Sequence, residues 1–161
     1  MTPLALAHLH QQVLEFATII CGDATRITKE QIVELEAANM ESHPRNGDPF
    51  EAYLSRMDLL VHTAMTSEGE LVGFAISCNE GRGKVYVYEL HVTAAHRRRG
   101  IARALLELCE QSSTSRGRNS PLLELQVHTA NSAAQGFYTH MGFVHMRQIC
   151  NGSVCVMQRK R

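Results

Sequence analysis

The first part of the chain has the apolar spacing of amphipathic helices. In Pro3–Ile20 an apolar side chain recurs every three or four residues, which predicts a helix with one buried stripe. Thr28-Lys-Glu-Gln31 has the form of a capping box and predicts a second helix through about Ser42. A short helix is expected over Phe50–Met57, after a loop rich in proline and glycine. The pattern therefore predicts a helical N-terminal region.

From Leu59 onward the apolar pattern changes to the alternation of β-strands, interrupted by two helical segments. Helices are predicted from Ile101 to about Ser113 and over Ala130–Met141, where Gly142 ends the second. The predicted strands are Leu59–Thr66, Leu71–Cys78, Lys84–Val92, Leu122–His128, Phe143–Cys150 and Ser153–Arg159. The last two strands should form a hairpin, since Asn151-Gly152 favours a type I′ turn.

Length and composition favour one α/β domain spanning residues 1–161. The five cysteines form no C-x-x-C pair, so we expect reduced intracellular thiols and no metal site. No apolar stretch is long enough to span a bilayer, and no basic residue precedes Arg26, which argues against a signal or transit peptide. These features predict a protein of the cytosol, the nucleus or both, without membrane contact.

The charge is unevenly distributed although the chain is neutral overall. Residues 1–80 carry 12 acidic and 4 basic side chains, whereas residues 81–161 carry 4 acidic and 12 basic side chains. A basic half suits a polyanionic ligand and an acidic half suits a cationic substrate. The alternative is that both are ordinary solvated faces.

A basic segment separates the strand Lys84–Val92 from the helix that follows. It contains Arg97, Arg98 and Arg99, and then the small residues Gly100 and Ala102. The start of a helix presents unpaired N–H groups with partial positive charge, and small residues let a ligand approach the backbone. The segment therefore predicts an anion site suited to a pyrophosphate, with a solvated basic turn as the alternative. It lacks the Gly-Lys-Ser/Thr of a nucleotide P-loop.

The pattern Arg97-x-x-Gly100-x-Ala102 after a strand resembles the coenzyme A loop of the GNAT superfamily of N-acetyltransferases. The segment from Asn131 to Phe143 resembles a second motif of that superfamily, Asn-x-x-Ala-x-x-Phe-Tyr-x-x-x-Gly-Phe. The resemblance implies the GNAT fold, with a mixed central β-sheet flanked by helices. In this fold the two parallel central strands, Lys84–Val92 and Leu122–His128, splay apart to admit acetyl-CoA. No metal is required.

The resemblance also implies roles for individual residues. The backbone of Leu90, His91 and Val92 would pair with the pantetheine arm, Asn131 would hydrogen-bond the same arm, and Tyr138 would protonate the leaving thiolate. The structural alternative for Tyr138 is an aromatic residue packed on the sheet. The cradle for the pyrophosphate would consist of Arg97, Arg98, Arg99, Gly100, Ile101, Ala102 and Arg103.

Glu89 is the candidate general base. A carboxylate between Tyr88 and Leu90 on a central strand is costly to bury unless it has a function or a partner. Burial makes a carboxyl harder to ionise, which suits a base near neutral pH. The alternative is a carboxylate that is paired with a neighbouring arginine.

A finer resemblance points to the NatD family, which acetylates histone N-termini. It rests on Tyr86-Val-Tyr88-Glu89 and on Leu35-Glu36-Ala-Ala-Asn39-Met40. By this resemblance Tyr86, Tyr88 and Gln126 would contact the acceptor peptide. The leading hypothesis is therefore an acetyl-CoA-dependent acetyltransferase acting on a protein N-terminus, as a monomer or weak dimer without direct nucleic-acid binding. The alternatives are a GNAT enzyme acting on a small amine or a lysine side chain, and a non-catalytic coenzyme A-binding domain.

Overall fold

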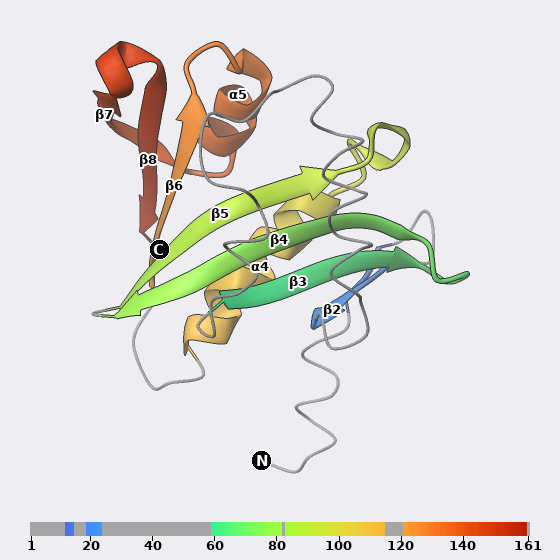
Figure 1. Cartoon of the computed structure of the whole chain (residues 1–161). Helices are drawn as coiled ribbons and strands as arrows, with labels where there is room; N and C mark the ends of the chain where they lie inside the picture. Colours follow the sequence, from blue (N-terminus) through green and yellow to red (C-terminus); the bar gives the residue numbers. More distant parts are fainter. Residues whose placement is uncertain (1–11, 15–18, 24–58, 82, 115–120, 161) are drawn as a thin grey trace.

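A computed structural model of the chain describes residues 12–14, 19–23, 59–81, 83–114 and 121–160. In these residues the chain has a mixed α/β fold in which helices pack on one large sheet (Figure 1). The helical elements are α4 (Ile101–Thr114), α5 (Ser132–His140) and the 3-10 turns η1 (Ala94–His96) and η2 (Cys150–Gly152). The strands are β1 (Gln12–Leu14), β2 (Ile19–Asp23), β3 (Leu59–Thr66), β4 (Leu71–Gly81), β5 (Lys84–Val92), β6 (Leu122–His128), β7 (Val144–Ile149) and β8 (Val154–Lys160).

The eight strands form one sheet in the order β1-β2-β3-β4-β5-β6-β8-β7. All neighbours are antiparallel except β5 and β6, which are parallel and are connected through α4. This arrangement confirms the predicted mixed sheet with two parallel central strands.

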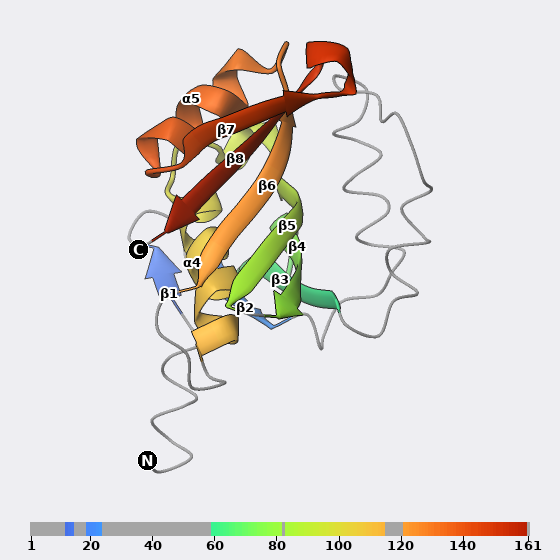
Figure 2. The ribbon, with the colours of Figure 1, turned by 90° about the vertical axis from the view of Figure 1, so that its left-hand side faces the viewer.

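The two central strands separate along their length. They are paired from Lys84 and Leu122 as far as Val87 and Leu125, and no pairing continues beyond that point. Past it, β5 stays paired with β4 as far as Val92, and β6 stays paired with β8 as far as His128. Figures 1 and 2 show β6 and β8 running away from β5 at this end. The predicted splay is therefore present, and it begins after Val87.

Both described helices cover the same face of the sheet (Figure 2). The amphipathic α4 buries Leu105 and Leu108 against β3, β4 and the end of β5. Leu106 of α4 joins a second cluster with Phe143 and residues of β6 and β8, on which α5 packs. Each such buried side chain contributes about 1.5–3 kcal/mol by leaving water. In β6 and β8 the residues of this second cluster are every second residue of the strand: Leu123, Leu125 and Val127, and Cys155 and Met157.

The segments predicted as strands beyond residue 58 are strands, and the final hairpin has the predicted turn. Asn151 and Gly152 both have positive φ, and the N–H of Ser153 donates to the carbonyl of Cys150 at 3.1 Å. These are the features of a type I′ turn, in which asparagine and glycine tolerate the left-handed conformation.

The helix predicted over Pro3–Ile20 is wrong where the structure describes it. Gln12–Leu14 and Ile19–Asp23 are strands, and β2 is paired with β3 from Ile19–Thr66 to Asp23–His62. The β-branched residues Val13, Ile19 and Ile20 suit a strand, and pairing with the edge of β3 outweighs the local helical spacing. The helices expected over 28–42 and 50–57 lie outside the described residues. Within the described part of the chain, no helix is both long and apolar enough to cross a membrane.

Candidate active site

A β-bulge in β5 lies at the point where the central strands separate. Ile76 of β4 is opposite Glu89, while the next residue, Ser77, is opposite Val87, so Tyr88 is the extra residue. Before the bulge, Val85 and Val87 are buried on the helix side of the sheet. The bulge shifts the alternation by one residue and places Glu89 and His91 on the face that Tyr88 occupies. Bulges commonly redirect side chains beside functional sites.

Glu89 forms a short polar contact with His91 on this face. Oε2 of Glu89 lies 2.9 Å from Nε2 of His91, and the two side chains are 13% and 22% exposed. The ring of His91 lies 5.1 Å from that of Phe74, its cross-strand neighbour on β4. Glu89 therefore contacts a histidine. The alternative to a general base that the sequence suggested was a pairing of Glu89 with an arginine.

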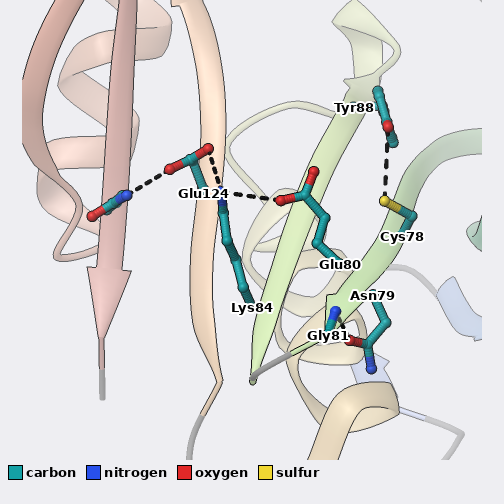
Figure 3. Close-up of polar contacts among 8 residues, drawn as sticks. Cys78, Asn79, Glu80, Gly81, Lys84, Tyr88 and Glu124 are labelled. Carbon is teal, nitrogen blue, oxygen red and sulfur yellow. Dashed lines mark hydrogen bonds and ion pairs between the residues drawn. The ribbon is translucent and has the colours of Figure 1, made fainter.

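Two tyrosines continue the same face toward the closed end of the sheet. The rings of Tyr86 and Tyr88 meet edge to face with centroids 4.7 Å apart. The thiol of Cys78 lies 3.7 Å from the hydroxyl of Tyr88, which ties that ring to β4 (Figure 3). Predicted acceptor residues and the predicted base therefore share one face of β5. Gln126 is exposed on β6, one residue beyond the last pair of the two central strands, and so lies across the splay.

The backbone of β5 has hydrogen-bonding groups directed into the splay. The N–H of Thr93 donates to the carbonyl of Val72 on β4 at 2.9 Å. Successive residues of a strand direct their backbone groups to opposite edges, so those of Leu90 and Val92 point away from β4. On that side β6 has already diverged. The predicted pairing with an extended ligand arm is therefore sterically available to Leu90 and Val92. The backbone of His91, which was predicted to take part, faces β4 instead.

The basic loop follows directly. Arg97 turns back, and its Nε donates to the carbonyl of Val92 at 3.0 Å, so this side chain braces the end of β5. Arg98 and Gly100 have φ of 64° and 79°, a left-handed conformation that is unusual for arginine and easy for glycine. Arg98, Arg99 and Arg103 are exposed. They provide the cationic charge at this end of the sheet.

The N-terminus of α4 carries backbone N–H groups that the helix itself does not use. Its first intrahelical hydrogen bond runs from the N–H of Ala104 to the carbonyl of Gly100, so the preceding N–H groups have no partner within the helix. No acidic residue lies in the first turn. The side chains of Ile101 and Ala102 pack into the core, so these two residues can offer a ligand their backbone only. The arrangement suits a phosphate, and the binding of a pyrophosphate here stays a prediction.

On the other side of the splay, Asn131 is the N-cap of α5. Its Oδ1 accepts a hydrogen bond from the N–H of Ala134 at 3.1 Å, which leaves the amide nitrogen as the group for a ligand. Gln135, which sequence reasoning missed, holds the same loop. Its Nε2 donates to the carbonyls of His128 and Thr129 at 3.1 and 2.8 Å. No sequence pattern marks such a role, because its partners are backbone carbonyls.

Tyr138 packs on the sheet at the root of the splay. Its ring lies 5.5 Å from that of Phe143 and 5.3 Å from that of Phe137. Burial, together with a smaller effect of the neighbouring Cys109, raises the pKa of Tyr138 well above its usual range, so its phenol keeps its proton. Burial also raises the pKa of Cys109 to about 12, so this thiol is not a nucleophile at neutral pH. The position of the ring agrees with the alternative that Tyr138 is an aromatic residue packed on the sheet. The role of Tyr138 as an acid stays a prediction.

A model of the acetyltransferase (GNAT) family matches residues 26–143. The chain belongs to this family. No curated protein sequence matches the chain significantly. Among solved structures, nourseothricin acetyltransferase is 25% identical, with a TM-score of 0.57, over 65% of this chain and 66% of that one. The finer NatD resemblance is not established by these comparisons.

Two further structures share the fold over nearly their whole length. The ribosomal-protein-S18-alanine N-acetyltransferase from Escherichia coli is 21% identical, with a TM-score of 0.64, over 88% of this chain and 93% of that one. NAA60 from Arabidopsis thaliana, solved with acetyl-CoA, is 21% identical, with a TM-score of 0.66, over 89% and 98%.

This GNAT chain is an acetyl-CoA-dependent acetyltransferase, and its acceptor is a peptide or a small molecule. The splay, the edge of β5 that faces it and the basic loop before α4 fit the acetyl arm and the pyrophosphate of this cosubstrate. Within the described residues, no group of three or more histidine, cysteine or acidic side chains is arranged to hold a metal ion.

Proposed function

We propose that the chain acetylates the α-amine of a protein N-terminus, with a histone-like N-terminal peptide as the acceptor. The observation that carries this proposal is the composition of one face of β5 at the splay. A carboxylate, Glu89, lies beside two tyrosines whose rings are in contact, and this face is opposite the helices that form the core. The net charge of −8 in residues 1–80 suits a cationic acceptor.

The proton chemistry favours an α-amine. Its pKa is about 8, against about 10.4 for lysine, so roughly a quarter of an α-amine is already neutral at about pH 7.5. One weak base is then enough to remove the remaining proton as the amine attacks. Glu89 supplies this carboxylate at the end of β5 that borders the splay, and its side chain, at 13% exposed, is accessible.

Each group of site residues has its own role in the proposed reaction. Acetyl-CoA supplies the activated acetyl group. The backbone of Leu90 and Val92 aligns the acetyl end in the splay, and the N-terminus of α4 with Arg98 and Arg99 holds the phosphates. Glu89 accepts the proton of the attacking amine, and the phenol of Tyr138 donates a hydrogen bond to the departing thiolate. Tyr86, Tyr88 and Gln126 contact the acceptor on either side.

A thiol-release assay tests this proposal. The panel consists of a histone-like N-terminal peptide, the same peptide blocked at its α-amine but containing lysine, a polyamine and free amino acids. We expect turnover on the unblocked peptide alone. Equal turnover on the blocked peptide would assign the activity to lysine, and turnover confined to the polyamine would exclude a peptide acceptor.

A small-molecule acceptor is the second candidate. The 25% identity with nourseothricin acetyltransferase favours it, because that protein is named for a small-molecule substrate. The polyamine and amino-acid arms of the same panel distinguish it from the peptide proposal.

A further inference from the structure

We infer that the side chain of His91 is the positioning residue for the general base Glu89. The inference rests on the proposed role of Glu89 and adds a residue for which only a backbone role was predicted. It does not depend on which amine is the acceptor. Its basis is the 2.9 Å contact between Nε2 of His91 and Oε2 of Glu89.

The chemistry of the contact shows which of the two atoms donates the hydrogen bond. A carboxylate that serves as a base is ionised and can only accept hydrogen bonds. The hydrogen between the two atoms therefore belongs to Nε2 of His91. This N–H donates to Oε2 and so orients the carboxylate that takes the proton from the amine. Bonds to a charged acceptor are about twice as strong as neutral ones, so the contact also favours the ionised form.

The ring of His91 is itself fixed by β4. It packs on the ring of Phe74 with centroids 5.1 Å apart, and Phe74 is fully buried. The main chain is held as well, because His91 is paired with Phe74 in the antiparallel ladder of β4 and β5. A donor held from both sides can hold its acceptor in one orientation.

The bulge makes this pairing possible. Glu89 and His91 are two residues apart and follow the extra residue Tyr88, so both side chains emerge on the face of the tyrosines. The proton transfer needs no other reactant. The amine loses one proton, the carboxylate of Glu89 gains it, and solvent removes it through the exposed part of the side chain.

Two substitutions of His91 separate its donor from its other properties. His91→Gln keeps an N–H near the position of Nε2 but does not titrate, whereas His91→Leu removes the donor. We expect His91→Leu to lower kcat about ten- to hundredfold, the loss expected for a hydrogen bond to a charged group. The KM for acetyl-CoA should be unchanged, and His91→Gln should recover most of the loss.

The measurements use the full chain on the best amine substrate of the wild-type enzyme. Thermal melting checks that each variant folds, and His145→Leu, an exposed histidine on β7, is the matched control. Glu89→Gln and the double variant with His91→Leu are measured in parallel. We expect the double variant to be no slower than Glu89→Gln, because His91 acts through Glu89.

Several outcomes overturn the inference. They are wild-type kcat in His91→Leu, a His91→Gln variant as slow as His91→Leu, and a loss confined to the KM for acetyl-CoA. If Glu89→Gln is slow while His91→Leu is fast, the inference fails and the proposed base stands. If Glu89→Gln is itself fully active, the proposed base fails, and the inference fails with it.

Discussion

Lys84 and Glu124 join the two central strands at their closed end, with Nζ of Lys84 2.8 Å from Oε1 of Glu124. Glu124 is buried, and it also accepts a hydrogen bond from the amide of Gln158 on β8. Lys84 further contacts Glu80 of β4 at 3.0 Å (Figure 3). One polar row thus connects four strands below the point where β5 and β6 separate. Since the parallel ladder is short, this row holds together strands that diverge further along.

Glu124→Gln should lower the free energy of unfolding by about 1–3 kcal/mol at pH 7, because it removes a hydrogen-bonded charge from a buried position. Glu80→Gln should cost less than about 1 kcal/mol, because that partner is 39% exposed and solvent screens it. Urea denaturation of the full chain measures both. Equal losses in the two variants would contradict the assignment of Glu124 as the central residue of the row.

The same row predicts a pH dependence of stability. Burial opposes the charge of Glu124, but the hydrogen bonds from Lys84 and Gln158 outweigh it and lower its pKa. The hydrogen bond with Glu124 likewise raises the pKa of Lys84 against the effect of burial. The contribution of Glu124 is then present above about pH 4.3 and is lost as the pH falls through the lowered folded-state pKa. That of Lys84 is present below about pH 10.4 and is lost as the pH rises through its raised value.

Denaturation between pH 3 and pH 7 should therefore show a smaller fall in stability for Glu124→Gln than for the wild type. Parallel curves for the two proteins would show that Glu124 does not contribute to acid unfolding.

Two neighbouring arginines should behave differently in acetyl-CoA binding. Arg98 is exposed at the loop, so Arg98→Ala should weaken binding by about 1–3 kcal/mol through lost phosphate contacts, and less at high salt. Arg97 braces the carbonyl of Val92, so Arg97→Ala should lower thermal stability as well. Isothermal titration at two salt concentrations measures the affinity, with Arg147→Ala on β7 as the control. Unchanged affinity in Arg98→Ala would place the phosphates elsewhere.

Asn131 offers two functions that substitutions can separate. Serine also caps helices well but lacks the amide, so Asn131→Ser should keep stability and weaken acetyl-CoA binding. Asn131→Ala should weaken binding to the same degree and also cost about 1 kcal/mol of stability, because Oδ1 caps α5. Thermal melting and titration of both variants provide the comparison. Wild-type affinity in Asn131→Ser would limit Asn131 to its capping role.

The strands that could be predicted from the sequence are those with strong local patterns. Lys84–Val92 and Leu122–His128 alternate β-branched or apolar residues with others, and both have the predicted bounds. The helix predicted over Pro3–Ile20 is wrong at Ile19 and Ile20, because pairing with β3, a distant segment, decides the structure of Ile19–Asp23. The bulge at Tyr88 could not be predicted for the same reason, since it exists only in the register with β4. The candidate site residues could thus be proposed from the sequence, but the contact of Glu89 with His91 could not be predicted.

The losses of kcat in Glu89→Gln and in Tyr138→Phe should differ in their pH dependence. Glu89→Gln should lower kcat at neutral pH, and raising the pH should recover part of it, because the amine then loses its proton unaided. Tyr138→Phe should cost less and by a constant factor, because burial raises the pKa of Tyr138 above the assay range and its phenol stays protonated throughout. Coenzyme A thiolate is also a fair leaving group without a full proton. A pH–rate profile from about pH 6 to 9.5 on the N-terminal peptide tests both variants. A pH-independent loss in Glu89→Gln would remove Glu89 as the base, and an alkaline limb that disappears in Tyr138→Phe would show that this phenol titrates during turnover.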